Sequence, residues 1–141
     1  MGSPQEDLLK IEAVVDPEII AQGNEGTLKI KITPLNGIRI SSHPEFMIKL
    51  DENDDLILPK VFFTGSELNF QTAQINGDIF LNLEKEIAIP FRVDERALIG
   101  RQQLNGEIIF TILSPDNWYI KTFQKFAADF QTKKFFKRKK K

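Results

Sequence analysis

Few residues of this sequence could carry out chemistry, and they are scattered along the chain. The 141 residues include no cysteine and a single histidine, His43. Thiol chemistry, disulfide exchange and thiolate metal sites are therefore excluded, and acid-base catalysis could draw on only one histidine, its commonest group. His43 follows Ser41 and Ser42, but neighbours on an extended segment point to opposite faces. Because Pro44 favours extended geometry at His43, we expect an exposed histidine at a strand end, not a serine-histidine pair.

Acidic residues gather at one place, the segment Asp51–Asp55, where four carboxylates occur within five residues. Calcium favours such oxygen clusters, but an EF-hand loop needs glycine where Leu56 stands and an acid where Phe62 stands. We interpret the segment as a solvated turn, with a weak cation site as the alternative. Nothing among the 20 acidic residues selects a carboxylate pair for glycoside hydrolysis, which leaves a hydrolase as a minor alternative. The sequence predicts no enzyme, no metal and no cofactor.

The only tryptophan and the only tyrosine, Trp118 and Tyr119, follow a proline-containing turn that begins at Ser114. Amphipathic aromatic side chains are favoured at binding surfaces. The alternative is that Trp118 plugs the end of the fold. With His43, these residues form the candidate binding site: Ser114, Trp118, Tyr119 and His43.

The elements that must position these residues are short β-strands. Apolar side chains alternate with polar ones through Thr27–Thr33 and Glu86–Val93, where Pro90 favours an edge. Residues 107–113 are apolar on both faces, which indicates a central strand. Residues 63–77 are polar and predict a long loop or an irregular edge. Residues 118–130 fit a strand and also a helical stripe, and we prefer a strand because the rest of the chain is strand.

Length and charge predict one folded domain with a distinct tail. We expect residues 8–130 to form the domain, residues 1–7 to be a disordered remnant and residues 131–141 to be a disordered basic tail. Residues 133–141 hold seven of the 19 basic side chains, so the remaining 12 face 20 acids, a net charge of −8. This acidic body argues against nucleic acid binding, whereas the tail could contact anionic lipid. No apolar run is long enough to cross a bilayer.

Three segments resemble the amino-terminal, periplasmic domain of the DsbD thiol:disulfide interchange proteins: Gly106–Tyr119, Pro34–Pro44 and Glu86–Val93. The resemblance implies an immunoglobulin-like sandwich outside the cytoplasm, with a leader removed from this sequence. At the positions that match the family's two cysteines, this chain has Ser114 and Tyr119, which cannot exchange a disulfide. Either the scaffold has lost redox transfer, or the cysteines were substituted.

We therefore predict an all-β, immunoglobulin-like antiparallel sandwich of about seven to nine strands. Its expected function is a non-catalytic, extracytoplasmic interaction module that binds a protein partner as a monomer. The alternative is a thiol-disulfide interchange domain whose cysteines were lost at positions 114 and 119.

Overall fold

The computed structural model describes residues 8–35, 37–42, 46–68, 70–113, 116 and 118–134, and the regular elements among them are all β-strands. No helix in this part of the chain is long and apolar enough to cross a membrane. The strands are β1 Leu9–Asp16, β2 Ile19–Ala21, β3 Glu25–Pro34, β4 Arg39–Ile40, β5 Met47–Leu50, β6 Leu56–Ile57, β7 Phe62–Thr64, β8 Gln71–Ile75, β9 Asp78–Asn82, β10 Ile87–Val93, β11 Gly100–Leu113 and β12 Tyr119–Lys133.

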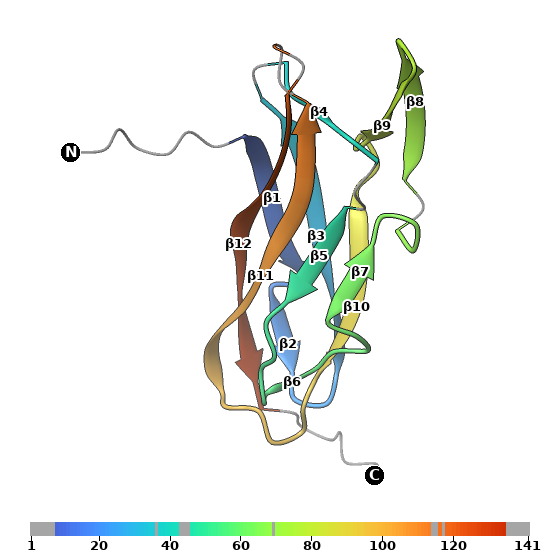
Figure 1. Ribbon diagram of the computed structural model, residues 1–141. Helices are drawn as coiled ribbons and strands as arrows, with labels where there is room; N and C mark the ends of the chain where they lie inside the picture. Colours follow the sequence, from blue (N-terminus) through green and yellow to red (C-terminus); the bar gives the residue numbers. More distant parts are fainter. Residues whose placement is uncertain are drawn as a thin grey trace, which may run out of the picture.

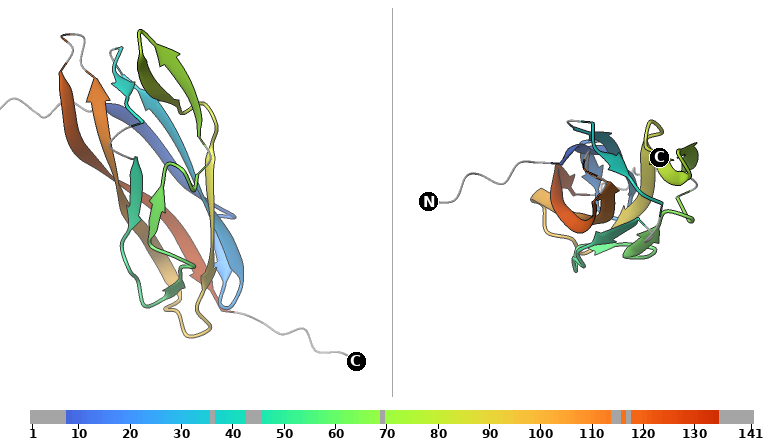
Figure 2. Two further views of the ribbon diagram at one scale, coloured as in Figure 1. Left: turned by 45° about the vertical axis from the view of Figure 1, so that its right-hand side comes forward. Right: turned by 45° about the horizontal axis from the view of Figure 1, so that its top comes forward.

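Two sheets pack face to face (Figure 1). Sheet A has the order β1-β3-β10-β6, and sheet B has the order β2-β12-β11-β5-β7, with β4 also paired to β11. β8 and β9 form a separate hairpin, sheet C, which projects at one end of the sandwich (Figure 2). β1, β3 and β10 take the places of strands A, B and E of an immunoglobulin domain, and β5, β11 and β12 those of C, F and G. The chain is therefore an all-β, immunoglobulin-like sandwich, as predicted.

The core lies between sheets A and B and is built from every second side chain of their strands. Burial alternates through the whole of β10, and in β12 the side chains of Phe126, Ala128 and Phe130 are buried. Phe123, which a helical stripe would bury, is 57% exposed. The segment that fitted both a strand and a helix is therefore a strand, because only a period of two matches its burial.

Several predicted boundaries differ from the structure. β12 continues to Lys133, three residues beyond the predicted end of the domain at residue 130. Residues 63–77, predicted as a long loop or an irregular edge, contain the end of β7 and the edge strand β8, so the edge was the correct alternative. Twelve strands are described where about seven to nine were expected. The excess comes from β2, β4, β6 and β7, which have two or three residues each.

The prediction of a central strand at residues 107–113 is confirmed, and the edge predicted from Pro90 is present along only part of β10. β11 lies between β12 on one side and β4 and β5 on the other, as expected for a segment that is apolar on both faces. β10 pairs with β3 along one edge, but β6 covers its other edge only at Arg92 and Val93. Pro90 therefore lies where the second edge is open, and its missing N–H leaves no sheet hydrogen bond unmade there.

Gly106 allows the central strand β11 to lie close to both of its neighbours. It pairs with Phe126 of β12 and with Leu50 of β5. A Cβ atom at this position would lie 2.7 Å from the carbonyl oxygen of Lys49 and 2.7 Å from the Cζ atom of Phe126. Both distances are shorter than van der Waals contact, and one of them is to backbone, which cannot move without opening the sheet.

We expect Gly106→Ala to lower the free energy of unfolding by about 1–3 kcal/mol, because the added methyl overpacks the centre of sheet B. Urea denaturation measures the change. Gly65→Ala is the matched control, since its Cβ would lie 3.4 Å from the nearest heavy atom, the Cβ of Phe46. Equal unfolding midpoints for the two variants would contradict this account of Gly106.

Candidate functional site

Two of the four predicted binding residues can be placed. Trp118 and Tyr119 are 69% and 51% exposed, whereas Ser114 and His43 lie outside the described residues. The exposure of Trp118 contradicts the alternative that it plugs the end of the sandwich. Both aromatic side chains therefore lie on the surface where a partner can reach them.

Tyr119 connects β12 to the tip of the β8–β9 hairpin. Its phenol donates a hydrogen bond to a carboxylate oxygen of Asp78, at 2.6 Å. Asp78 follows the two-residue turn Asn76-Gly77, whose φ angles of 52° and 86° are those of the type I′ turn that Asn-Gly sequences favour. The hydrogen bond, the loss of solvation and the negative charge of Asp78 all favour the neutral phenol and raise the pKa of Tyr119 above 10.0.

Tyr119 also belongs to an apolar surface on the outer side of sheet B. β12 points Phe126, Ala128 and Phe130 into the core, so its odd-numbered side chains point outward. Phe123 lies opposite Ile109 of β11, which in turn lies opposite Met47 of β5. We call this surface the aromatic face. It comprises Tyr119, Phe123, Ile109, Met47 and Phe62.

Three lysines stand among the residues of the aromatic face. Lys121 and Lys125 alternate with Tyr119 and Phe123 along β12, and both are exposed. Lys49 of β5 lies opposite Phe62 of β7, with its ammonium 5.7 Å from the centre of that ring. An ammonium over a ring is attracted by the negative π-face, which keeps the lysine close to the apolar surface.

One acid stands among these lysines. Glu107 of β11 lies opposite Lys125 on one side and opposite Lys49 on the other. A second carboxylate, that of Asp78, accepts the hydrogen bond of Tyr119 at the end of the face. With three lysines against these two carboxylates, the aromatic face keeps a small positive charge, although the folded body as a whole is acidic. Alternation of exposed aromatic and basic side chains from Tyr119 to Lys125 was the sequence signal that could have revealed it.

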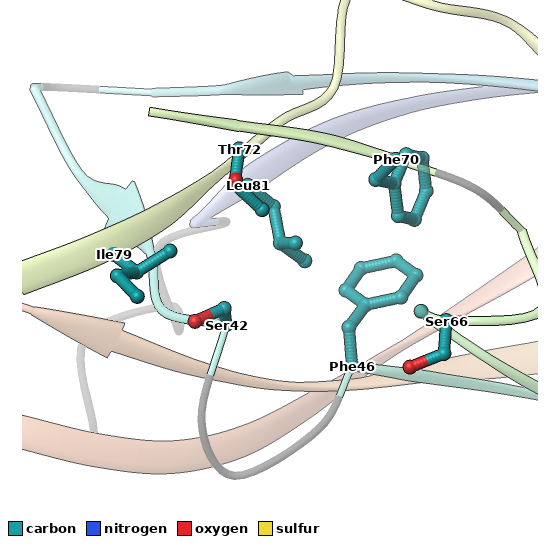
Figure 3. A pocket seen from close by; sticks show the side chains of 8 residues that line it. Ser42, Phe46, Ser66, Phe70, Thr72, Ile79 and Leu81 are labelled. Carbon is teal, nitrogen blue, oxygen red and sulfur yellow. The ribbon is translucent and has the colours of Figure 1, made fainter. Parts of the chain in front are cut away.

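A pocket of about 440 Å³ lies between the hairpin and the body of the sandwich (Figure 3). The rings of Phe46 and Phe70 meet edge to face, with centroids 5.1 Å apart, and Leu81 of β9 points toward them. The described residues of the lining supply serine and threonine hydroxyls but no acid or base. The pocket can therefore accept an apolar, uncharged group, but its described lining supplies nothing that would activate a hydroxyl for catalysis.

The acidic turn Asp51–Asp55 stabilises the end of the sandwich that lies away from the β8–β9 hairpin. The carboxylate of Asp55 accepts hydrogen bonds from the side-chain amide of Gln102 at 2.8 Å and from the N–H of Leu98 at 3.3 Å. Asn53 caps the turn by accepting from the N–H of Asp55 at 2.8 Å. The described residues contain no group of three or more His, Cys, Asp or Glu that could hold a metal ion.

Tyr119 is the only tyrosine, so the absorbance of its phenolate during an alkaline titration reports on this contact alone. We expect Asp78→Asn to lower the pKa of Tyr119 toward 10.0, because the amide carries no charge to oppose ionisation. The stabilisation from this contact is present below the pKa of the unfolded chain and is lost as pH rises through the raised folded pKa. Asp129→Asn, on the exposed side of β12, is the control that leaves the titration unchanged. Identical titrations of wild type and Asp78→Asn would rule out the contact.

Comparison with known proteins identifies no family. No protein-family model matches the sequence, and no curated protein matches it. Among solved structures, the cohesin module of a family 33 glycoside hydrolase from Clostridium perfringens aligns with 91% of this chain and 98% of its own, at 9% identity and a TM-score of 0.44. A conjugate transposon protein from Bacteroides vulgatus aligns with 93% of this chain and 90% of its own, at 12% identity and a TM-score of 0.39. The major pilin subunit of Bacillus cereus aligns with 88% of this chain and 39% of its own, at 8% identity and a TM-score of 0.44. Likenesses this distant support no statement about a partner or an activity.

Proposed function

We propose that this chain is a non-catalytic interaction module that binds an acidic protein surface through the aromatic face. The observation that carries the proposal is the exposure of three aromatic side chains on one side of one sheet. Phe123, Tyr119 and Phe62 are 57%, 51% and 46% exposed. Aromatic residues in the centre of a surface patch are the usual hot spots of protein interfaces.

The dimensions of the aromatic face suit the centre of an interface. Four strands spaced about 4.8 Å apart and side chains repeating about every 6.8 Å along β12 give a patch of about 14 by 20 Å. Such a patch is smaller than the roughly 800 Å² that each partner contributes to a stable complex. It therefore provides the apolar centre, and the surrounding polar surface provides the rim.

The charge on this face supports an acidic partner. Lys49, Lys121 and Lys125 place positive charge on a body whose remaining residues are strongly acidic. A basic partner would be attracted to the acidic body and repelled by these lysines, whereas an acidic partner is attracted only where the lysines stand. Complementary charge of this kind orients the approach of a partner and speeds association.

The non-catalytic part of the proposal is supported by composition and by the site. The chain has no cysteine and one histidine, and the described lining of its apolar pocket has no acid or base. An extracytoplasmic location and contact of the basic tail with lipid stay predictions from the sequence. Residues 135–141 of that tail lie outside the described part of the chain.

We expect Phe123→Ser to weaken binding of the partner by about 30-fold, because truncation of a central aromatic anchor removes about 2 kcal/mol. The partner is isolated from an extract of the source cells on the immobilised chain, and its affinity for each variant is then measured by calorimetry.

Lys121→Glu should slow association and make it less sensitive to salt, since the attraction is partly between charges.

Val14→Ser is the matched control for Phe123→Ser. Val14 is 55% exposed and lies on the outer side of sheet A, so its loss removes a similarly exposed apolar group from the other face. Thermal unfolding should be nearly the same for the two variants. If Val14→Ser weakened binding as much as Phe123→Ser, the aromatic face would not be the binding surface.

A further inference from the structure

β8 is a fully accessible edge strand. It pairs only with β9, and it is the outermost strand of the projecting hairpin (Figures 1 and 2). Four of its five residues are exposed, and no other strand of the described residues covers its outer edge. Residues 70–77 include no charged side chain and no proline. An accessible edge without charge or proline is a template for another strand.

The other long edge of the molecule is protected. β1 carries Lys10, Glu12 and Asp16, whose charges oppose pairing with a further strand. In addition, the side-chain amide of Gln124 donates to the carbonyl of Leu9 at 2.7 Å and accepts from its N–H at 3.2 Å. This amide occupies the backbone groups that a further strand would need.

The remaining edges are also unsuited to strand addition. β2, β6 and β7 have only two or three residues. The open edge of β10 contains Pro90, and the part of β12 that β2 leaves uncovered carries Lys121 and Lys125. Among the described edge strands, β8 alone combines a length of five residues with the absence of charge and proline.

The turn of the hairpin determines which backbone groups of β8 face outward. A two-residue turn is closed by a hydrogen-bonded pair, here Ile75 and Asp78. Hydrogen bonding alternates along an antiparallel strand, so Ala73 also bonds to β9. The N–H and C=O groups of Thr72 and Gln74 therefore point away from β9, toward the open edge.

The hairpin is held firmly against the sandwich, so this edge is presented in a fixed position. Phe80 of β9 is buried and bridges to Ser41. The N–H of Ser42 donates to the carbonyl of Ile79 at 3.0 Å, and Tyr119 holds Asp78. A strand that adds to β8 therefore meets an edge already ordered for pairing, which reduces the entropy lost on binding.

We propose that β8 pairs antiparallel with β8 of a second copy of this chain, giving a continuous sheet β9-β8-β8-β9 across a two-fold axis. One register gives hydrogen-bonding partners to the outward-facing backbone groups of both Thr72 and Gln74. In this register Thr72 lies opposite Gln74 of the second copy, and Ala73 lies on the two-fold axis. This register opposes no like charges, and the small side chain of Ala73 suits the close approach of a non-hydrogen-bonded pair.

This dimer is independent of the aromatic face, because β8 contributes no residue to that face. It differs from the monomer expected from the sequence. An edge of five residues buries much less surface than a standard interface, so we expect a weak dimer with a dissociation constant of about 10 µM to 1 mM.

The test uses two double variants that differ only in the sign of one charge. In Thr72→Lys/Gln74→Lys, each lysine faces a lysine of the other copy, and we expect dimerisation to weaken at least about tenfold. In Thr72→Lys/Gln74→Glu, each lysine faces a glutamate, and we expect the dimer to be retained. Sedimentation equilibrium from about 10 µM to 1 mM measures the association, and the Tyr119 titration verifies that the hairpin is in place.

Three results would overturn the proposal. One is a wild-type chain that remains monomeric over the whole concentration range. Another is a Thr72→Lys/Gln74→Lys variant that dimerises as strongly as wild type. The third is loss of the dimer in both double variants. If Thr72 and Gln74 lie opposite each other, the variant with opposite charges must keep the dimer.

Discussion

The long antiparallel pairing of β11 with β12 is the constraint on which the rest of the molecule depends. Its register is regular from Gly100 opposite Thr132 to Leu113 opposite Tyr119. Since side chains alternate between faces with a period of two, this single register assigns each residue of both strands to the inner or the outer face of sheet B. Phe126 and Phe130 are buried, and Phe123 and Tyr119 are exposed, for the same reason. A shift by one residue would exchange the two sets.

The same alternation made most of the fold predictable from the sequence. Thr27–Thr33 and Glu86–Val93 alternate without a break, and both became strands of sheet A with one face in the core. The central position of β11 followed from its two apolar faces, and the open edge at β10 followed from Pro90. In each case the sequence carries a local signal that the packing of two sheets reinforces.

Elements without such a signal could not be predicted. β2 has three residues, too few to show a period, and exists because β12 offers its edge at Gln131–Lys133. β8 buries almost nothing, so its sequence has no apolar alternation, and the Asn76-Gly77 pair alone was not enough to predict a hairpin. The contact between Tyr119 and Asp78 joins residues 41 positions apart and depends on where the hairpin lies. Tyr119 was thus predicted as a surface residue, but its partner was not.

The core also determines where binding can occur. The inner faces of sheets A and B are filled by each other, which leaves the outer faces, the strand edges and the pocket beside the hairpin for other molecules. The outer side of sheet A around Val14 carries Glu12, Lys29 and Lys31, and mixed charge of this kind favours water over a partner. The aromatic face, in contrast, exposes apolar side chains to water. The uncharged edge of β8 exposes backbone hydrogen-bonding groups, whereas charges, proline or side-chain contacts protect the other long edges. Both features weaken the argument for a purely structural role, because exposed apolar surface and unprotected edges promote aggregation unless a specific partner covers them. Since they lie on different strands, one molecule can engage a partner through the face while the edge remains available to a second copy.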